Sequence, residues 1–160
     1  MEKYAILRVL ILAWLALASV SAGAESRLRS ARDLAGEAAS SARQGRVLLV
    51  LFSEPGCPWC ERVRREFLLP MQSNAGYRAR VAFVQVDVNS TRALRDFDGQ
   101  TTTHAGFARV NGVRLYPTVM LFGPAGQRLA EPLPGFSGPD FYGAYLDQRI
   151  DAAVDKLRGK

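Results

Sequence analysis

The sequence of 160 residues predicts an α/β fold in which a mixed β-sheet is covered by helices on both faces. Short apolar runs of strand length alternate along the chain with segments whose apolar residues recur at helical spacing. Near the end, the stretch "YPTVMLFGPAGQRLAEPLPGF" instead predicts two consecutive strands joined by a turn. The expected order is therefore helix, strand, helix, strand, helix, strand, strand and helix.

The first residues have the layout of a secretory signal peptide. Basic residues precede an apolar stretch over 9–20, and small residues follow as far as Ala24. We expect residues 1–24 to be a signal peptide that is cleaved after Ala24. An uncleaved N-terminal membrane anchor is the alternative, although a spanning helix normally needs about 20 apolar residues. Residues 25–160 fit one globular domain in length and composition.

The formal net charge of +6 at pH 7 comes mostly from arginines that are scattered along the chain among acidic residues. The sequence contains no run of five or six basic residues and no basic strand with interleaved aromatic residues. Nucleic acid is therefore not an expected partner, and a solvated basic surface is the simpler interpretation.

Three elements are predicted in the first half of the chain. Residues 26–44 are rich in helix formers and predict a helix. Residues 46–52, "RVLLVLF", form a continuous apolar run that predicts a strand buried on both faces. Residues 57–69 show helical spacing, with Pro58 in the first turn and Pro70 at the far end.

The second half predicts the remaining strands. Residues 81–88 read as a strand, and the polar segment that follows reads as a loop or hairpin. A helix is expected over 103–110, and a hairpin is expected from strands at 118–122 and 128–133.

A last helix is expected after Ser137, which we predict as its cap, with Pro139 in the first turn. Its apolar stripe is predicted to contain Phe141, Tyr145, Leu146, Ile150, Val154 and Leu157.

The only two cysteines, Cys57 and Cys60, lie in "CPWC" at the start of the second helix. Such a short loop barely restricts the unfolded chain, so a purely structural disulfide is disfavoured. Covalent haem attachment needs histidine after the second cysteine, where Glu61 stands. A structural zinc site needs four ligands, and His104 is the one further candidate, although a surface or capping role suits it better. No cofactor or metal is expected.

A thiol attacks a disulfide as a thiolate, which the N-terminus of a helix stabilises. Cys57 is expected at that position, beside Pro58, and Cys60 follows one turn later. We therefore predict Cys57 as the nucleophile and Cys60 as the resolving thiol.

The motif "VLLVLFSEPGCPWCERV", followed about sixty residues later by "GVRLYPTVMLFGPAGQ", resembles the thioredoxin-like superfamily. Exported members such as the SoxW-like and Dsb-related thiol-disulfide oxidoreductases are the most similar group. The resemblance covers roughly residues 30–155. It implies a thioredoxin fold, in which a central mixed β-sheet is flanked by helices and a cis-proline loop lies beside the cysteines.

The resemblance also implies the substrate-binding residues. Pro117 matches the cis-proline, with Tyr116 before it and Thr118 after it, and this loop would pair with an extended substrate segment. Trp59, between the cysteines, is expected either to contact substrate or to cover the sulfur atoms in part.

The chain departs from cytosolic thioredoxins at several positions. Leu51 stands where many of them carry a buried aspartate, and Glu54 is expected to be a solvated loop acid rather than a proton relay. The segment 89–104 is longer than in a minimal thioredoxin, yet too short for the helical insertion of Dsb-type oxidases. The chain also has no room for an N-terminal dimerisation domain, so a monomer is expected.

The implied function is that of a periplasmic thiol-disulfide oxidoreductase acting on cysteine-containing exported proteins. It would exchange electrons with a membrane or periplasmic donor or acceptor. Similarity to the SoxW-like proteins favours a reductase, with oxidase and isomerase left open. The alternative is a redox-inert or metal-handling binding module with the same fold.

Overall fold

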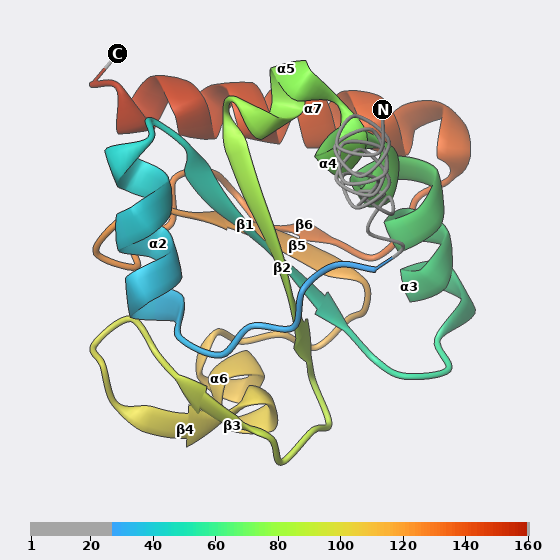
Figure 1. The fold of residues 1–160 in the computed structure, drawn as a ribbon. Helices are drawn as coiled ribbons and strands as arrows, with labels where there is room; N and C mark the ends of the chain where they lie inside the picture. The colour runs from blue at the N-terminus through green and yellow to red at the C-terminus, as the bar shows by residue number, and fades with distance from the viewer. Residues whose placement is uncertain (1–26, 160) are drawn as a thin grey trace, which may run out of the picture.

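The computed structural model describes residues 27–159, so the predicted signal peptide lies outside the described residues. The central sheet has the strand order β2-β1-β5-β6. β1 pairs in parallel with β2 and antiparallel with β5, and β5 pairs antiparallel with β6. The predicted mixed sheet is thus confirmed (Figure 1). The bounds of the four strands are β1 Val47–Ser53, β2 Val81–Asp87, β5 Thr118–Phe122 and β6 Leu133–Pro134.

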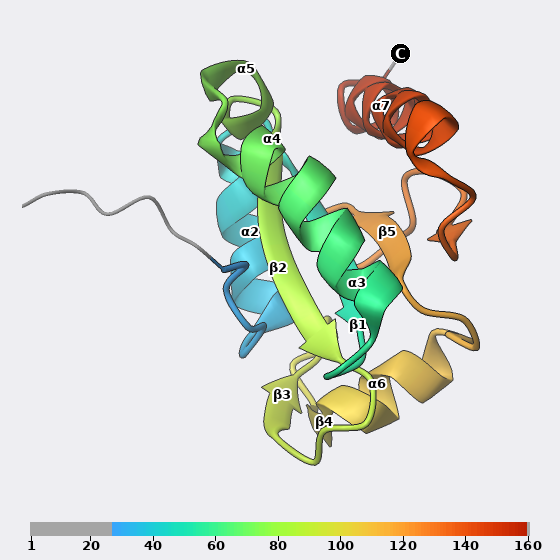
Figure 2. The same cartoon turned by 90° about the vertical axis from the view of Figure 1, so that its right-hand side faces the viewer.

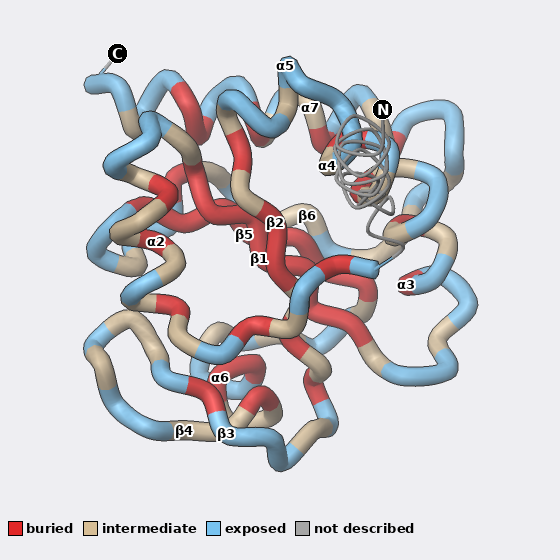
Figure 3. The backbone as a smooth tube through the Cα atoms, in the orientation of Figure 1, coloured by how far each residue is buried: buried red, intermediate tan, exposed pale blue. Residues whose placement is uncertain are grey.

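Helices cover both faces of this sheet. Their bounds are α2 Leu34–Arg43, α3 Pro58–Val63, η1 Arg64–Leu68, α4 Leu69–Ser73, α5 Ala75–Arg78, α6 His104–Val110 and α7 Pro139–Leu157. One face of β1 packs with α2 and α6, and the other packs with α3 to α4 and α7. β1 is buried along its whole length, as the red central strands of Figure 3 show. The prediction of a strand buried on both faces is confirmed.

The first helix begins at Leu34, so the prediction of a helix from residue 26 is wrong for its first turns. The preceding residues run extended along β2, where the Ala31 N–H donates to the Gln85 carbonyl at 2.8 Å. Pairing of this kind satisfies an edge of the sheet that helical residues would leave bare. Asp33 then caps α2, since its side chain accepts a backbone N–H of the first turn.

The second helix does not stop at Pro70, contrary to the prediction. α3, η1 and α4 form one nearly continuous run that ends at Ser73 (Figure 2). Proline in an α-helix lacks a donor and collides with the carbonyl four residues earlier. The π-helical turn of η1 precedes it, with the Leu69 N–H bonded to the carbonyl of Arg64 five residues back. This wider turn accommodates Pro70 without ending the run.

The polar segment after β2 is a hairpin of β3, Ala93–Arg95, and β4, Thr101–Thr103, and α6 follows as predicted. The strand predicted at 128–133 is largely wrong. Arg128 forms an isolated bridge to Phe122 of β5, and the ladder resumes only at the two residues of β6. Pro132 and Pro134 have no N–H to donate to a continuous ladder.

α7 is confirmed, but its start and its buried face differ from the prediction. Its N-cap is Gly138, at φ 115°, and not Ser137. Phe141 and Tyr145 are 62% and 46% exposed, whereas Tyr142 is fully buried. The later members of the predicted stripe, Leu146, Ile150 and Val154, are buried as predicted, so only the start of the stripe was assigned to the wrong residues.

His104 is fully buried, which contradicts the expected surface or capping role. Its Nδ1 accepts the backbone N–H of Asp87 at 3.0 Å, and its Nε2 lies 2.9 Å from the carbonyl of Ala31. A neutral imidazole protonated at Nε2 satisfies both contacts. His104 therefore fastens α6 to the end of β2 and to the extended N-terminal segment.

Burial lowers the pKa of His104 below its ordinary value of 6.5, against the opposing effects of the Ala31 carbonyl and the Asp87 carboxylate. The unfolded chain therefore takes up a proton below about pH 6.5 that the folded chain refuses, so stability falls as the pH drops through that range. As the pH is lowered below about 6.5, we expect the free energy of unfolding to fall more steeply in the wild type than in His104→Gln. The two slopes should differ by up to about 1.4 kcal/mol per pH unit.

Urea unfolding at pH 7.5 and pH 5.5 measures this difference. His104 is the one histidine in the chain, so the comparison isolates its titration. Equal losses in the two proteins would show that His104 does not couple pH to folding.

Candidate active site

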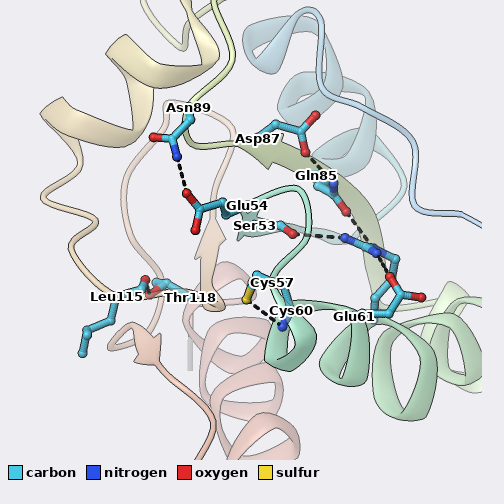
Figure 4. Close-up of a disulfide and its surroundings, with 11 residues drawn as sticks. Ser53, Glu54, Cys57, Cys60, Glu61, Gln85, Asp87, Asn89, Leu115 and Thr118 are labelled. Carbon is cyan, nitrogen blue, oxygen red and sulfur yellow. Dashed lines mark hydrogen bonds and ion pairs between the residues drawn. A yellow bond between two sulfur atoms is a disulfide. The ribbon is translucent and has the colours of Figure 1, made fainter.

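The two cysteines lie where β1 passes into α3. β1 ends at Ser53, and the loop turns at Gly56, whose φ of 80° suits glycine. Cys57 is the N-cap of α3, and Pro58 occupies the first turn. A disulfide joins Cys57 to Cys60, with their Cα atoms 5.3 Å apart (Figure 4).

The two sulfur atoms differ in accessibility. Cys57 is partly exposed, whereas Cys60 is fully buried. The Sγ of Cys57 also accepts the backbone N–H of Cys60 at 3.1 Å. An incoming group can therefore reach Cys57 first, and the same N–H would stabilise negative charge on that sulfur.

The predicted proline loop lies beside this pair. Thr118 is the partner of Phe52 near the end of β1, so the residues before Thr118 adjoin the cysteine loop. The peptide bond between Tyr116 and Pro117 is cis. Pro117 is buried, and Tyr116 is partly buried against the core that contains α2 and α6. The structure thus brings two motifs together that lie far apart in the sequence.

Thr118 and Leu115 form the outer part of this loop. Thr118 is buried, and its Oγ1 donates to the carbonyl of Leu115 at 2.8 Å, so its hydroxyl holds the loop closed. Leu115 is 61% exposed, and in Figure 4 Thr118 lies between it and Cys57, on the side of the cysteines away from Glu61. The sequence analysis did not single out Leu115, because its exposure depends on the bend that follows it.

Trp59 is the outer member of an aromatic cluster. Its indole is 54% exposed and stacks on Phe136, with ring centroids 5.7 Å apart and an interplanar angle of 22°. Phe136 also contacts Phe67 and Tyr142, and the guanidinium of Arg62 lies 5.2 Å from its centroid. Sequence reasoning missed Phe136, which follows Gly135 in a short turn-rich stretch without a periodic apolar pattern.

Arg64 is a second residue that the sequence analysis missed. It begins the π-helical turn and is only 18% exposed. Its Nη2 donates to the Oγ of Ser53 at 3.0 Å, its Nε donates to the Oε1 of Gln85 at 2.9 Å, and it forms an ion pair with Glu61. The helix that carries the cysteines is thereby tied to the ends of β1 and β2. Arg64 and Glu61 also line a surface hollow that reaches Cys57.

Leu51 and Glu54 occupy the positions where sequence reasoning looked for an acid. Leu51 is fully buried in the apolar core. Glu54 is partly buried, lines the same hollow as Cys57 and accepts a hydrogen bond from the amide of Asn89. It is therefore anchored by Asn89, and not the freely solvated acid that was expected.

Within residues 27–159, no group of three histidine, cysteine, aspartate or glutamate side chains is placed to hold a metal ion. Both nitrogens of His104 are engaged by the backbone. In the same described range, no helix is long and apolar enough to cross a membrane.

Solved structures similar to this chain include several thioredoxin-fold proteins. A thioredoxin-fold protein from Helicobacter pylori is 16% identical, covers 86% of this chain and 96% of its own, and has a TM-score of 0.55. Thioredoxin from Malassezia sympodialis is 19% identical over 78% of this chain and 94% of its own, with a TM-score of 0.49. The periplasmic thioredoxin SoxS from Paracoccus pantotrophus is 22% identical over 68% and 99%, with a TM-score of 0.43. No curated protein matches the sequence of this chain.

The family model described as a thioredoxin-like domain matches residues 35–150, which is most of the chain. The Helicobacter pylori structure shares the fold of this chain. The predicted thioredoxin fold is confirmed. The chain belongs to the thioredoxin-like domain family, and its C-x-x-C pair on that fold supports thiol-disulfide redox chemistry.

Proposed function

We propose that this protein is an exported, periplasmic thiol-disulfide oxidoreductase that reduces disulfides in cysteine-containing exported proteins. The observation that supports it most strongly is the asymmetry of the cysteine pair. Cys57 is partly exposed at the start of a helix, and its sulfur accepts a hydrogen bond from the backbone N–H of Cys60. Cys60 is fully buried one turn later. Nucleophile and resolving thiol need these two different environments.

The reaction begins with the reduced pair. The thiolate of Cys57 attacks one sulfur of the substrate disulfide, forms a mixed disulfide and releases the other substrate sulfur as a thiolate, which takes up a proton. The thiolate of Cys60 then attacks the Sγ of Cys57. This second step releases the reduced substrate and leaves the Cys57–Cys60 disulfide, so two electrons have passed from the protein to the substrate.

The substrate would lie along the Tyr116–Pro117 loop. An extended segment there can pair with backbone groups next to Pro117, in the manner of an added strand. Trp59 and Thr118 bound the same surface, with Trp59 exposed and Thr118 supporting the loop from inside. Backbone pairing accepts many sequences, which suits an enzyme with several protein substrates.

The oxidised pair must regain two electrons before the next cycle. We propose that a dithiol protein in the membrane or the periplasm supplies them, and that the enzyme acts as a monomer. The direction of electron flow rests on the resemblance to SoxW-like reductases. A redox-inert or metal-handling module is the competing function that the experiments below address.

Trapping the intermediate tests the assignment of the two cysteines. In Cys60→Ser the resolving sulfur is missing, so we expect a dithiothreitol-sensitive mixed disulfide with substrate to accumulate on non-reducing gels. In Cys57→Ser no such species should form, because Cys60 is buried. A mixed disulfide in Cys57→Ser, or in neither variant, would contradict the assignment.

The reduction potential tests the direction of the reaction. We expect a value near that of thioredoxin, about −270 mV, when the protein is equilibrated with dithiothreitol or glutathione and its free thiols are alkylated. A value near about −120 mV would instead indicate an oxidant of exported thiols. Metal retained by both cysteines, with no reversible couple, would establish the binding module.

Substitution of Arg64 tests its effect on the nucleophile. Arg64→Met removes a cation near the Cys57 hollow and leaves Glu61 unpaired, and both changes disfavour the thiolate. We expect iodoacetamide to alkylate reduced Cys57 about threefold more slowly at pH 7. Arg65→Met, at an exposed neighbouring residue, is the control and should react at the wild-type rate. Equal rates in all three proteins would exclude this role for Arg64.

A further inference from the structure

The segment after β5 contacts both halves of the cysteine site. The Gly135 N–H donates to the Pro117 carbonyl at 2.7 Å. Phe136, the next residue, stacks on Trp59 between the two cysteines. A single short turn therefore sets the position of the proline loop and of the tryptophan together.

The ring of Phe136 is held firmly from its other sides. Its centroid lies 5.3 Å from that of Tyr142 and 6.3 Å from that of Phe67, and Tyr142 is fully buried in the core. The guanidinium of Arg62 adds a cation–π contact at 5.2 Å. Phe136 is thus a fixed surface against which the indole rests.

The indole of Trp59 stacks on Phe136, yet 54% of the residue stays exposed. Large aromatic side chains are usually buried for most of their area, so an indole held open to solvent beside a reactive sulfur is an available apolar contact surface.

We propose that Phe136 is a positioning residue that holds Trp59 as an apolar subsite for the side chain next to the substrate cysteine. This inference rests on the proposed function, because the substrate cysteine must reach the Sγ of Cys57. Trp59 follows Cys57 by two residues in the first turn of α3, and an extended substrate segment advances only about 3.3 Å per residue away from its own cysteine. The residue adjoining the substrate cysteine therefore lies within reach of the indole. The protein would therefore react faster with substrates that have an apolar residue next to the cysteine.

Single-turnover reduction of two peptide disulfides tests the proposal. Each probe is a symmetrical disulfide of one synthetic peptide, and the two peptides differ only in leucine or glutamine after the cysteine. The reduced full-length protein is mixed with excess peptide and quenched with an alkylating agent, and the loss of its free thiols is followed by mass spectrometry. We expect the wild type to reduce the leucine peptide about fivefold faster, as suits one added apolar contact on an aromatic ring.

Variants at position 136 separate positioning from general stability. Phe136→Tyr keeps the ring and should keep the fivefold ratio, whereas Phe136→Ala should bring the ratio to about one. Loss of structure alone would slow both peptides equally and leave the ratio unchanged. Phe136→Leu preserves apolar packing without ring stacking and should also lower the ratio if the alanine variant fails to fold. Phe141→Ala, at an exposed phenylalanine of α7, is the matched control and should match the wild type.

The outcomes distinguish failure of the subsite from failure of the proposed function. A wild-type ratio of about one, or an unchanged ratio in both Phe136→Ala and Phe136→Leu, overturns the subsite while the enzyme remains a reductase. Failure of the reduced wild type to react with either peptide overturns the proposed function, and the subsite with it.

Discussion

The pairing of β1 with a strand on each side places every part of the site. β1 is buried on both faces, and it ends at Ser53, directly before the cysteine loop. Its parallel neighbour β2 ends at Asp87, opposite Ser53, and its antiparallel neighbour β5 begins at Thr118, opposite Phe52. The cysteines, the proline loop and the partners of Arg64 therefore all lie at the same end of the sheet. Apolar burial of a single strand thus positions polar chemistry that the strand itself does not contain.

The helix that follows β1 must satisfy two demands with one backbone. Its first residues present the cysteines and direct Arg64 toward the strand ends, while Leu68 and Met71 further along enter the apolar core. The π-helical turn between them changes the rotational phase of the helix and precedes Pro70. Turns of this type are frequent at functional positions, because a change of phase re-aims the side chains on either side.

Sequence patterns predicted the elements whose evidence is local. The strand β1 and the helix start at the cysteines could be predicted, because a continuous apolar run and a proline in the first turn are visible in neighbouring residues. The roles of Arg64, His104 and Phe136 depend on partners far away in the chain, and no local pattern contains those partners. The prediction of a helix before α2 failed for a related reason. Residues 29–31 form hydrogen bonds with the edge strand β2, and this pairing outweighs their helical propensity.

The surroundings of Cys57 divide into two sides with different chemistry. Toward Glu61 and Arg64 the surface is charged and hydrogen-bonded, and it belongs to the helix and the ends of β1 and β2. Toward Trp59 it is an exposed aromatic surface, in which the indole stacks on Phe136 and Arg62 lies against the ring of Phe136. In the proposed reaction, the charged side would act on the Cys57 sulfur through its electric field, whereas the aromatic side would contact the residue next to the substrate cysteine. Trp59 and Glu61 lie on the same helix, α3, but Trp59 is held by Phe136, whereas Arg64 is held by Ser53 and Gln85 of the sheet. Substitutions of Phe136 and of Arg64 share no partner, so we expect their effects to be separable.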